Sequence, residues 1–116
     1  MHIKQIVDQQ YAQLLVNEKT NTYFAHLILE EHLPRIYDFW CFVLDVDAKD
    51  HVYKGSAFEP HSKLGLENVD FEIWQQCLKN AVMSNFIGEK ANLMLEKAAQ
   101  LGMMFQYKLG LLKLDA

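Results

Sequence analysis

Apolar side chains recur at steps of three and four residues along four segments of this chain. That spacing places them on one face of an α-helix. Outside the middle of the chain, Leu, Ala, Gln, Glu and Lys are frequent, and these residue types favour helix over strand. The pattern predicts an all-α protein, with one further helical turn at Tyr23 and Phe24. The four predicted helices cover about residues 3–16, 27–46, 69–87 and 89–110.

Particular residues indicate where these helices begin, bend and end. Pro34 removes one backbone donor from the second helix, at a usual cost of about 3 kcal/mol in a helix interior. We therefore expect it near the first turn or at a kink. Asp70 is expected to be the N-cap of the third helix. Gly88 and Gly110 are expected to end the third and fourth helices.

Length and charge limit the classes of partner. A chain of 116 residues, 51% of them hydrophobic, suits one domain with one core over residues 1–116. Eleven basic residues stand against fifteen acidic ones, which gives a net charge of −4, and Arg35 is the only arginine. Nucleic acids and acidic membrane surfaces require clustered cations. We therefore expect neither as a partner.

The cysteines and the first residues indicate the compartment. Cys41 and Cys77 lie in apolar helical stretches and do not form a CxxC pair. Buried thiols in a reducing compartment are the simplest interpretation. The chain shows neither the apolar run of a signal peptide nor a window of about 20 apolar residues. We expect a soluble cytoplasmic protein.

The irregular segment 47–68 is rich in aromatic and apolar residues, among them Tyr53, Phe58 and His61. Loops longer than about 12–15 residues are usually functional in compact domains. A flat apolar cofactor against this segment would supply volume that side chains alone do not, and His61 would be a candidate iron ligand. The ordinary alternatives are a surface histidine at His61 and packing roles for Tyr11 and Trp74, which face inward.

An ordered set of motifs is similar to those of the group III (P-class) truncated haemoglobins, over about residues 5–108. The motifs "HLPRIYDFW" and "YKG…PH…FEIW" are specific only in combination. No Gly-Gly pair occurs, as is usual for this group. In chain order the set comprises Tyr11 in "QQYAQLL", Phe24 in "NTYF", His32 in "EEHLPRIYDFW", Tyr53 and His61 in "YKGSAFEPHSKLGL", and Trp74 in "DFEIW".

The resemblance implies a two-over-two helical sandwich around a haem. His61 would be the proximal iron ligand, and the haem would be non-covalent haem b, because the chain has no CxxCH motif. Phe24 and Ile36 would pack on the porphyrin. Arg35 and Tyr53 would bind the haem propionates, for which a guanidinium is the better partner.

The resemblance also implies which residues face a bound ligand. Tyr11, His32 and Trp74 would surround the open iron position, and His32 and Trp74 would contact the haem as well. Hydroxyl and indole donors in this place favour tight binding of dioxygen, for storage or transport, and of nitric oxide or carbon monoxide. The same donors suit redox chemistry, either oxidation of nitric oxide or activation of peroxide, with an electron-donating reductase as partner. A helical interaction module without haem is the alternative from another class of protein.

Overall fold

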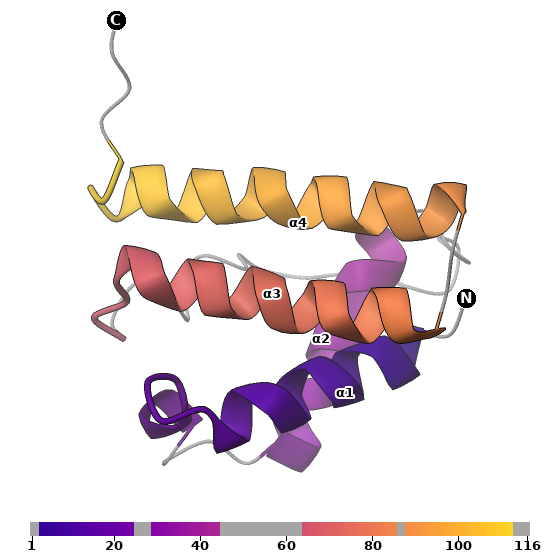
Figure 1. Cartoon of the computed structure of the whole chain (residues 1–116), viewed down its shortest axis with the longest axis horizontal. Coiled ribbons are helices and arrows are strands. Elements are labelled where there is room, and N and C mark those ends of the chain that lie inside the picture. The colour runs from indigo at the N-terminus through magenta and orange to yellow at the C-terminus, as the bar shows by residue number, and fades with distance from the viewer. Residues whose placement is uncertain (1–2, 25–28, 45–63, 86–87, 113–116) are drawn as a thin grey trace, which may run out of the picture.

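The computed structural model describes residues 3–24, 29–44, 64–85 and 88–112 (Figure 1). Within these ranges every regular element is helical, which confirms the all-α prediction. None of the described helices is long and apolar enough to cross a membrane. In chain order the elements are α1 (Ile3–Val16), the short 3-10 helix η1 (Asn21–Phe24), α2 (Leu29–Val43), α3 (Asn68–Asn85) and α4 (Glu89–Lys108).

The helix boundaries follow the sequence pattern closely at α1 and less closely elsewhere. α1 has the predicted bounds, and η1 is the predicted aromatic turn. α2 ends at Val43, before the predicted end at residue 46, and Pro34 lies in its second turn. Because proline has no N–H, the carbonyl of Glu30 lacks its usual donor there. α4 ends at Lys108 rather than at residue 110.

Asp70 is not the N-cap of α3, so that prediction was wrong. The helix begins at Asn68, which places Asp70 in the first turn. Its carboxylate accepts the backbone N–H of Glu67 at 2.7 Å, and its own N–H donates to the carbonyl of Glu67 at 3.0 Å. An acidic side chain that reaches back to the capping residue is one arm of a capping box.

Gly110 lies just beyond the C-cap Leu109 of α4 and terminates the helix from that position. Its φ of 76° is a left-handed conformation that glycine adopts without strain. The N–H of Gly110 donates to the carbonyl of Tyr107 at 3.0 Å, and the N–H of Leu111 donates to that of Gln106 at 2.8 Å. These two bonds form a Schellman motif, which satisfies carbonyls that the helix end leaves without donors.

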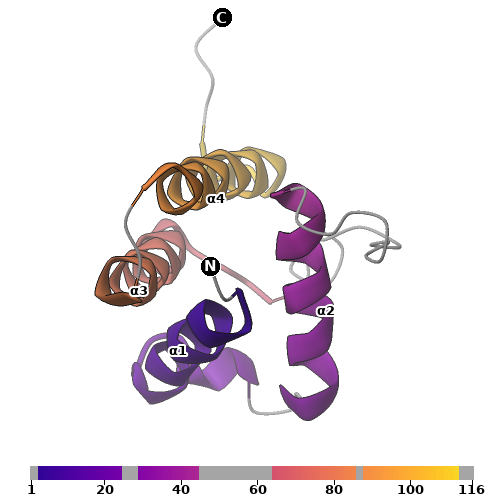
Figure 2. The ribbon, with the colours of Figure 1, turned by 90° about the vertical axis from the view of Figure 1, so that its right-hand side faces the viewer.

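α1 and α3 form the centre of the protein. The principal helix contacts join α1 to α3, α3 to α4 and α1 to α2. α3 and α4 run antiparallel side by side (Figure 1). In the view turned by 90°, α2 and α3 lie on opposite sides of the molecule (Figure 2). The largest fully buried apolar side chains come from all four helices: Ile6, Val7, Trp40, Leu78, Val82 and Met94.

α2 is the least enclosed of the four helices. Along one face of α2, a stripe of side chains recurs at steps of three and four residues, and only Trp40 of this stripe is buried, with 1% of its surface exposed. The remaining members of that stripe are half-buried, so the described residues cover this apolar face only in part. These half-buried members are Leu29, His32, Ile36, Phe39 and Val43.

The two cysteines differ in burial. Cys77 is buried in α3, and burial raises the pKa of its thiol, which keeps it protonated. Cys41 on α2 is half-buried. The expectation of a buried thiol is therefore met at Cys77 and only in part at Cys41.

Candidate functional site

Tyr11 lies on the buried face of α1, with 8% of its surface exposed. Its ring meets Phe24 of η1 edge to face, with ring centroids 5.7 Å apart and planes at 78°. Burial raises the pKa of Tyr11 to about 12, although the indole N–H of Trp74, which donates to the phenol oxygen, lowers it. Tyr11 is therefore a neutral phenol that keeps its proton throughout the physiological range.

Trp74 comes from the second turn of α3 and is half-buried against the core. An indole nitrogen only donates, so the phenol oxygen of Tyr11 is the acceptor in this pair. A phenol that accepts one hydrogen bond can still donate its own proton. The structure thus brings Tyr11, Phe24 and Trp74 together from three elements, and these three side chains form an aromatic cluster.

The predicted residues on α2 take different positions. His32 and Ile36 are half-buried one turn apart, and Ile36 packs against the core. Arg35 is exposed and is not part of the aromatic cluster. Tyr53 and His61 lie outside the described residues, so their predicted roles stay predictions.

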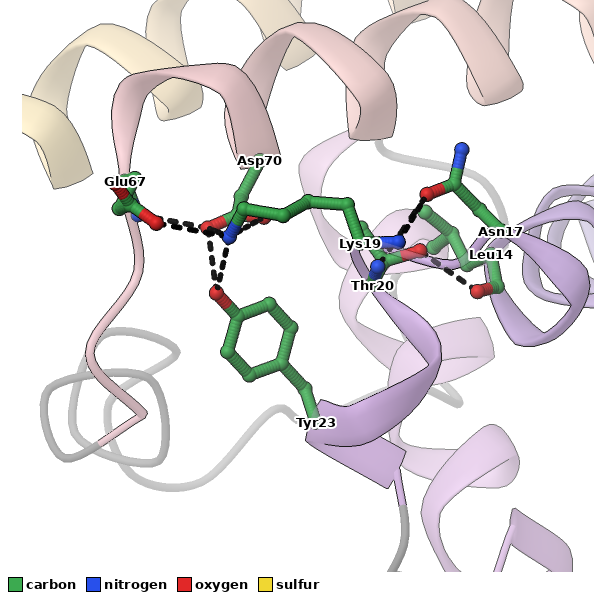
Figure 3. A network of polar contacts seen from close by, with 7 residues as sticks. All are labelled: Leu14, Asn17, Lys19, Thr20, Tyr23, Glu67 and Asp70. Atoms are coloured by element: carbon green, nitrogen blue, oxygen red, sulfur yellow. Dashed lines mark hydrogen bonds and ion pairs between the residues drawn. The ribbon is translucent and has the colours of Figure 1, made fainter.

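A polar network that the sequence did not indicate joins η1 to the start of α3 (Figure 3). The hydroxyl of Tyr23 donates to Oδ2 of Asp70 at 2.6 Å. The Nζ of Lys19 lies 3.1 Å from Oδ1 of Asp70, 3.1 Å from the Tyr23 oxygen and 3.0 Å from a carboxylate oxygen of Glu67. Only 4% of Asp70 is exposed, so these bonds surround a buried carboxylate.

The network determines the charge of Asp70. Burial alone would raise the pKa of this carboxyl group. Hydrogen bonds from Tyr23, from the N–H of Glu67 and from Lys19 outweigh burial and hold the pKa below its ordinary value of 3.8. Hydrogen bonds to Tyr23, Glu67 and Asp70 in turn raise the pKa of Lys19. Asp70 and Lys19 therefore form a charged pair at neutral pH.

The same segment is also fastened to α1. The hydroxyl of Thr20 donates to the carbonyl of Leu14 at 2.7 Å, and the side chain of Asn17 accepts the N–H of Lys19 at 2.9 Å. η1 is thus held to α1 through its preceding turn and to α3 through Tyr23. Because Phe24 follows Tyr23 directly, the network fixes the position at which its ring meets Tyr11.

We expect Asp70→Ala to lower the free energy of unfolding by about 2–3 kcal/mol, because it leaves the hydrogen-bond donors around a buried carboxylate without their partner. Denaturant unfolding measures this change. Glu72→Ala is the matched control, since Glu72 is exposed on the same helix and should change stability by less than about 0.5 kcal/mol. Equal losses in the two variants would contradict a special role for Asp70.

The contribution of Asp70 should also depend on pH. A carboxyl group whose pKa is lowered on folding stabilises the folded state fully above its unfolded pKa of 3.8. That stabilisation is lost as pH falls through the folded pKa. The difference in Tm between the wild type and Asp70→Asn should therefore be constant near neutrality and shrink below about pH 4. A difference that grows with acidity would contradict the lowered pKa.

Comparison with known proteins gives a structural match. Neither the protein-family models nor the curated proteins match this chain. Among solved structures, the group III truncated hemoglobin from Campylobacter jejuni superposes with a TM-score of 0.80 at 21% sequence identity. The superposition covers 92% of this chain and 87% of that one. The chain therefore has the all-helical fold of the truncated haemoglobins.

Proposed function

We propose that this protein binds one haem b non-covalently through His61 and that the opposite side of the iron takes dioxygen or another diatomic ligand. The observation that carries the proposal is the buried phenol of Tyr11 with the half-buried indole of Trp74 beside it. A protonated phenol whose oxygen already accepts an indole N–H is a directed donor within an apolar surrounding. The shared fold with a truncated hemoglobin supports the same proposal.

The described side chains suit a haem. Its porphyrin is flat and apolar, and the half-covered face of α2 offers apolar side chains of matching character, Leu29, Leu33 and Ile36. Its propionates are anionic and belong at the surface, where the exposed guanidinium of Arg35 is a suitable partner. Phe24 adds an aromatic ring beside the Tyr11 phenol.

A bound haem supplies an iron centre that takes diatomic ligands reversibly and can exchange electrons. The residues of this chain determine how long a ligand stays. Tyr11 would donate its O–H to such a ligand, and the Trp74 N–H would orient the phenol and make it a stronger donor. Phe24, which contacts the Tyr11 ring, would help to exclude water from this space, and Ile36 would do the same from α2.

Titration of the purified full chain with haemin tests the proposal. We expect a Soret band that saturates at one haem per chain. Because haemin adheres to exposed apolar surface, the same titration in denaturant is the control and should not saturate at a defined ratio. A folded chain that stays colourless with added haemin would instead favour the helical interaction module.

A further inference from the structure

Gln10 is a buried amide on the otherwise apolar stripe of α1, with 0% of its surface exposed. Its Oε1 has no hydrogen-bond partner within the part of the chain that the structure describes. A buried acceptor without a partner is unfavourable, and Met or Leu would fill similar volume without that cost. The contact that the structure does show for this amide is made by its donor.

The donor of Gln10 connects it to the proposed site. Its Nε2 donates to the backbone carbonyl of Trp74 at 3.1 Å. The indole of Trp74 lies beside the phenol of Tyr11 and lowers its pKa, and Tyr11 follows Gln10 directly on α1. Two adjacent residues of α1 thus hold Trp74 at its main chain and at the far end of its side chain.

We infer that Gln10 is a positioning residue that holds Trp74 in place beside Tyr11 and thereby aims the Tyr11 O–H. Without its bond, Trp74 loses its backbone contact with α1, and the position of its indole beside Tyr11 is held less firmly. The hydrogen bond between the two aromatic side chains does not depend on haem. Its effect on a diatomic ligand rests on the proposed function.

The chain contains a matched control for this inference. The Nε2 of Gln13 donates to the carbonyl of Cys77 at 3.3 Å, three residues further along both helices. Gln13 also accepts a hydrogen bond from Asn80 at 3.1 Å. Gln13→Met therefore removes the same kind of contact between α1 and α3 without touching Trp74.

The ¹⁵N–¹H resonance of the Trp74 indole measures the positioning directly in the full chain, studied as the diamagnetic carbon monoxide form where haem is present. The chain has two tryptophans, so Trp74→Phe assigns the resonance and Trp40 is an internal reference. We expect Gln10→Met and Gln10→Leu to shift the Trp74 resonance in the same direction as Tyr11→Phe. Gln13→Met should leave it in place.

Oxygen dissociation from the reconstituted protein is the second readout, and Gln10→Met should accelerate it roughly two- to tenfold, as expected for weakening one hydrogen bond. An unshifted Trp74 resonance in both Gln10 variants, or an equal shift in Gln13→Met, would overturn the positioning role. A chain that takes up no haem yet shows the specific shift would reject the proposed function and leave this inference standing.

Discussion

Tyr11→Phe should release dioxygen about tenfold to a hundredfold faster than the wild type, once the protein is reconstituted with haem. The substitution keeps the ring and its contact with Phe24 but removes the only O–H of the cluster. Hydrogen bonds to a group that carries negative charge typically contribute about 1.5–3 kcal/mol, which corresponds to this range of rates. Stopped-flow measurement of oxygen dissociation tests the expectation.

Tyr37→Phe is the matched control for Tyr11→Phe. The pKa of Tyr37 is also raised to about 12, mainly by burial and in addition by a hydrogen bond to Asp8. Its side chain is half-buried. Its hydroxyl is occupied by Asp8, so its loss should leave oxygen dissociation unchanged. An identical rate in Tyr11→Phe and the wild type would remove Tyr11 from the mechanism.

The second large effect is expected for His61→Ala, a variant that should lose the haem. Mutation of a residue that hydrogen-bonds to a metal ligand already lowers metal affinity by about 10–100-fold. Loss of the ligand itself should therefore lower haem affinity by more than about a hundredfold. Haemin transfer to a competing apoprotein measures this affinity. Imidazole in solution should restore part of the wild-type spectrum, because the missing group is the ring.

His51→Ala is the control for His61→Ala, since it changes another histidine in the stretch of sequence between α2 and α3. The chain has five histidines, and the proposal requires that His61 alone is essential for the bond to iron. If His51→Ala or His32→Ala loses the haem while His61→Ala keeps it, the ligand has been assigned to the wrong residue.

The sequence was most informative where a periodic apolar face ends at a polar break. α1 begins and ends where predicted because Ile3, Ile6, Val7 and Leu14 are buried at helical spacing and Asn17 follows. The first residue of α3 was predicted less well from the sequence. Asp70 is chemically suited to an N-cap, and only the contacts with Glu67, Tyr23 and Lys19 show that it acts from inside the first turn.

The sequence indicated which side chains of the candidate site face inward, but it could not indicate their contacts, and the roles of these residues stay predictions. Helical spacing and the family resemblance both placed Tyr11 and Trp74 inward, and the structure brings them together. Sequence spacing could not show that the Trp74 indole donates to Tyr11, because this depends on how α1 crosses α3. Gln10 was missed for the same reason. Its partner is a backbone carbonyl, which every residue carries, so the sequence cannot indicate the contact.

Absorption spectra of the reduced, haem-reconstituted wild-type protein, recorded before and after addition of carbon monoxide, test haem binding and the open ligand position together. We expect a five-coordinate ferrous spectrum that converts fully to the carbon monoxide complex. A reduced protein without haem absorption, or one whose spectrum carbon monoxide leaves unchanged, would show that this chain does not bind diatomic ligands at a histidine-ligated iron.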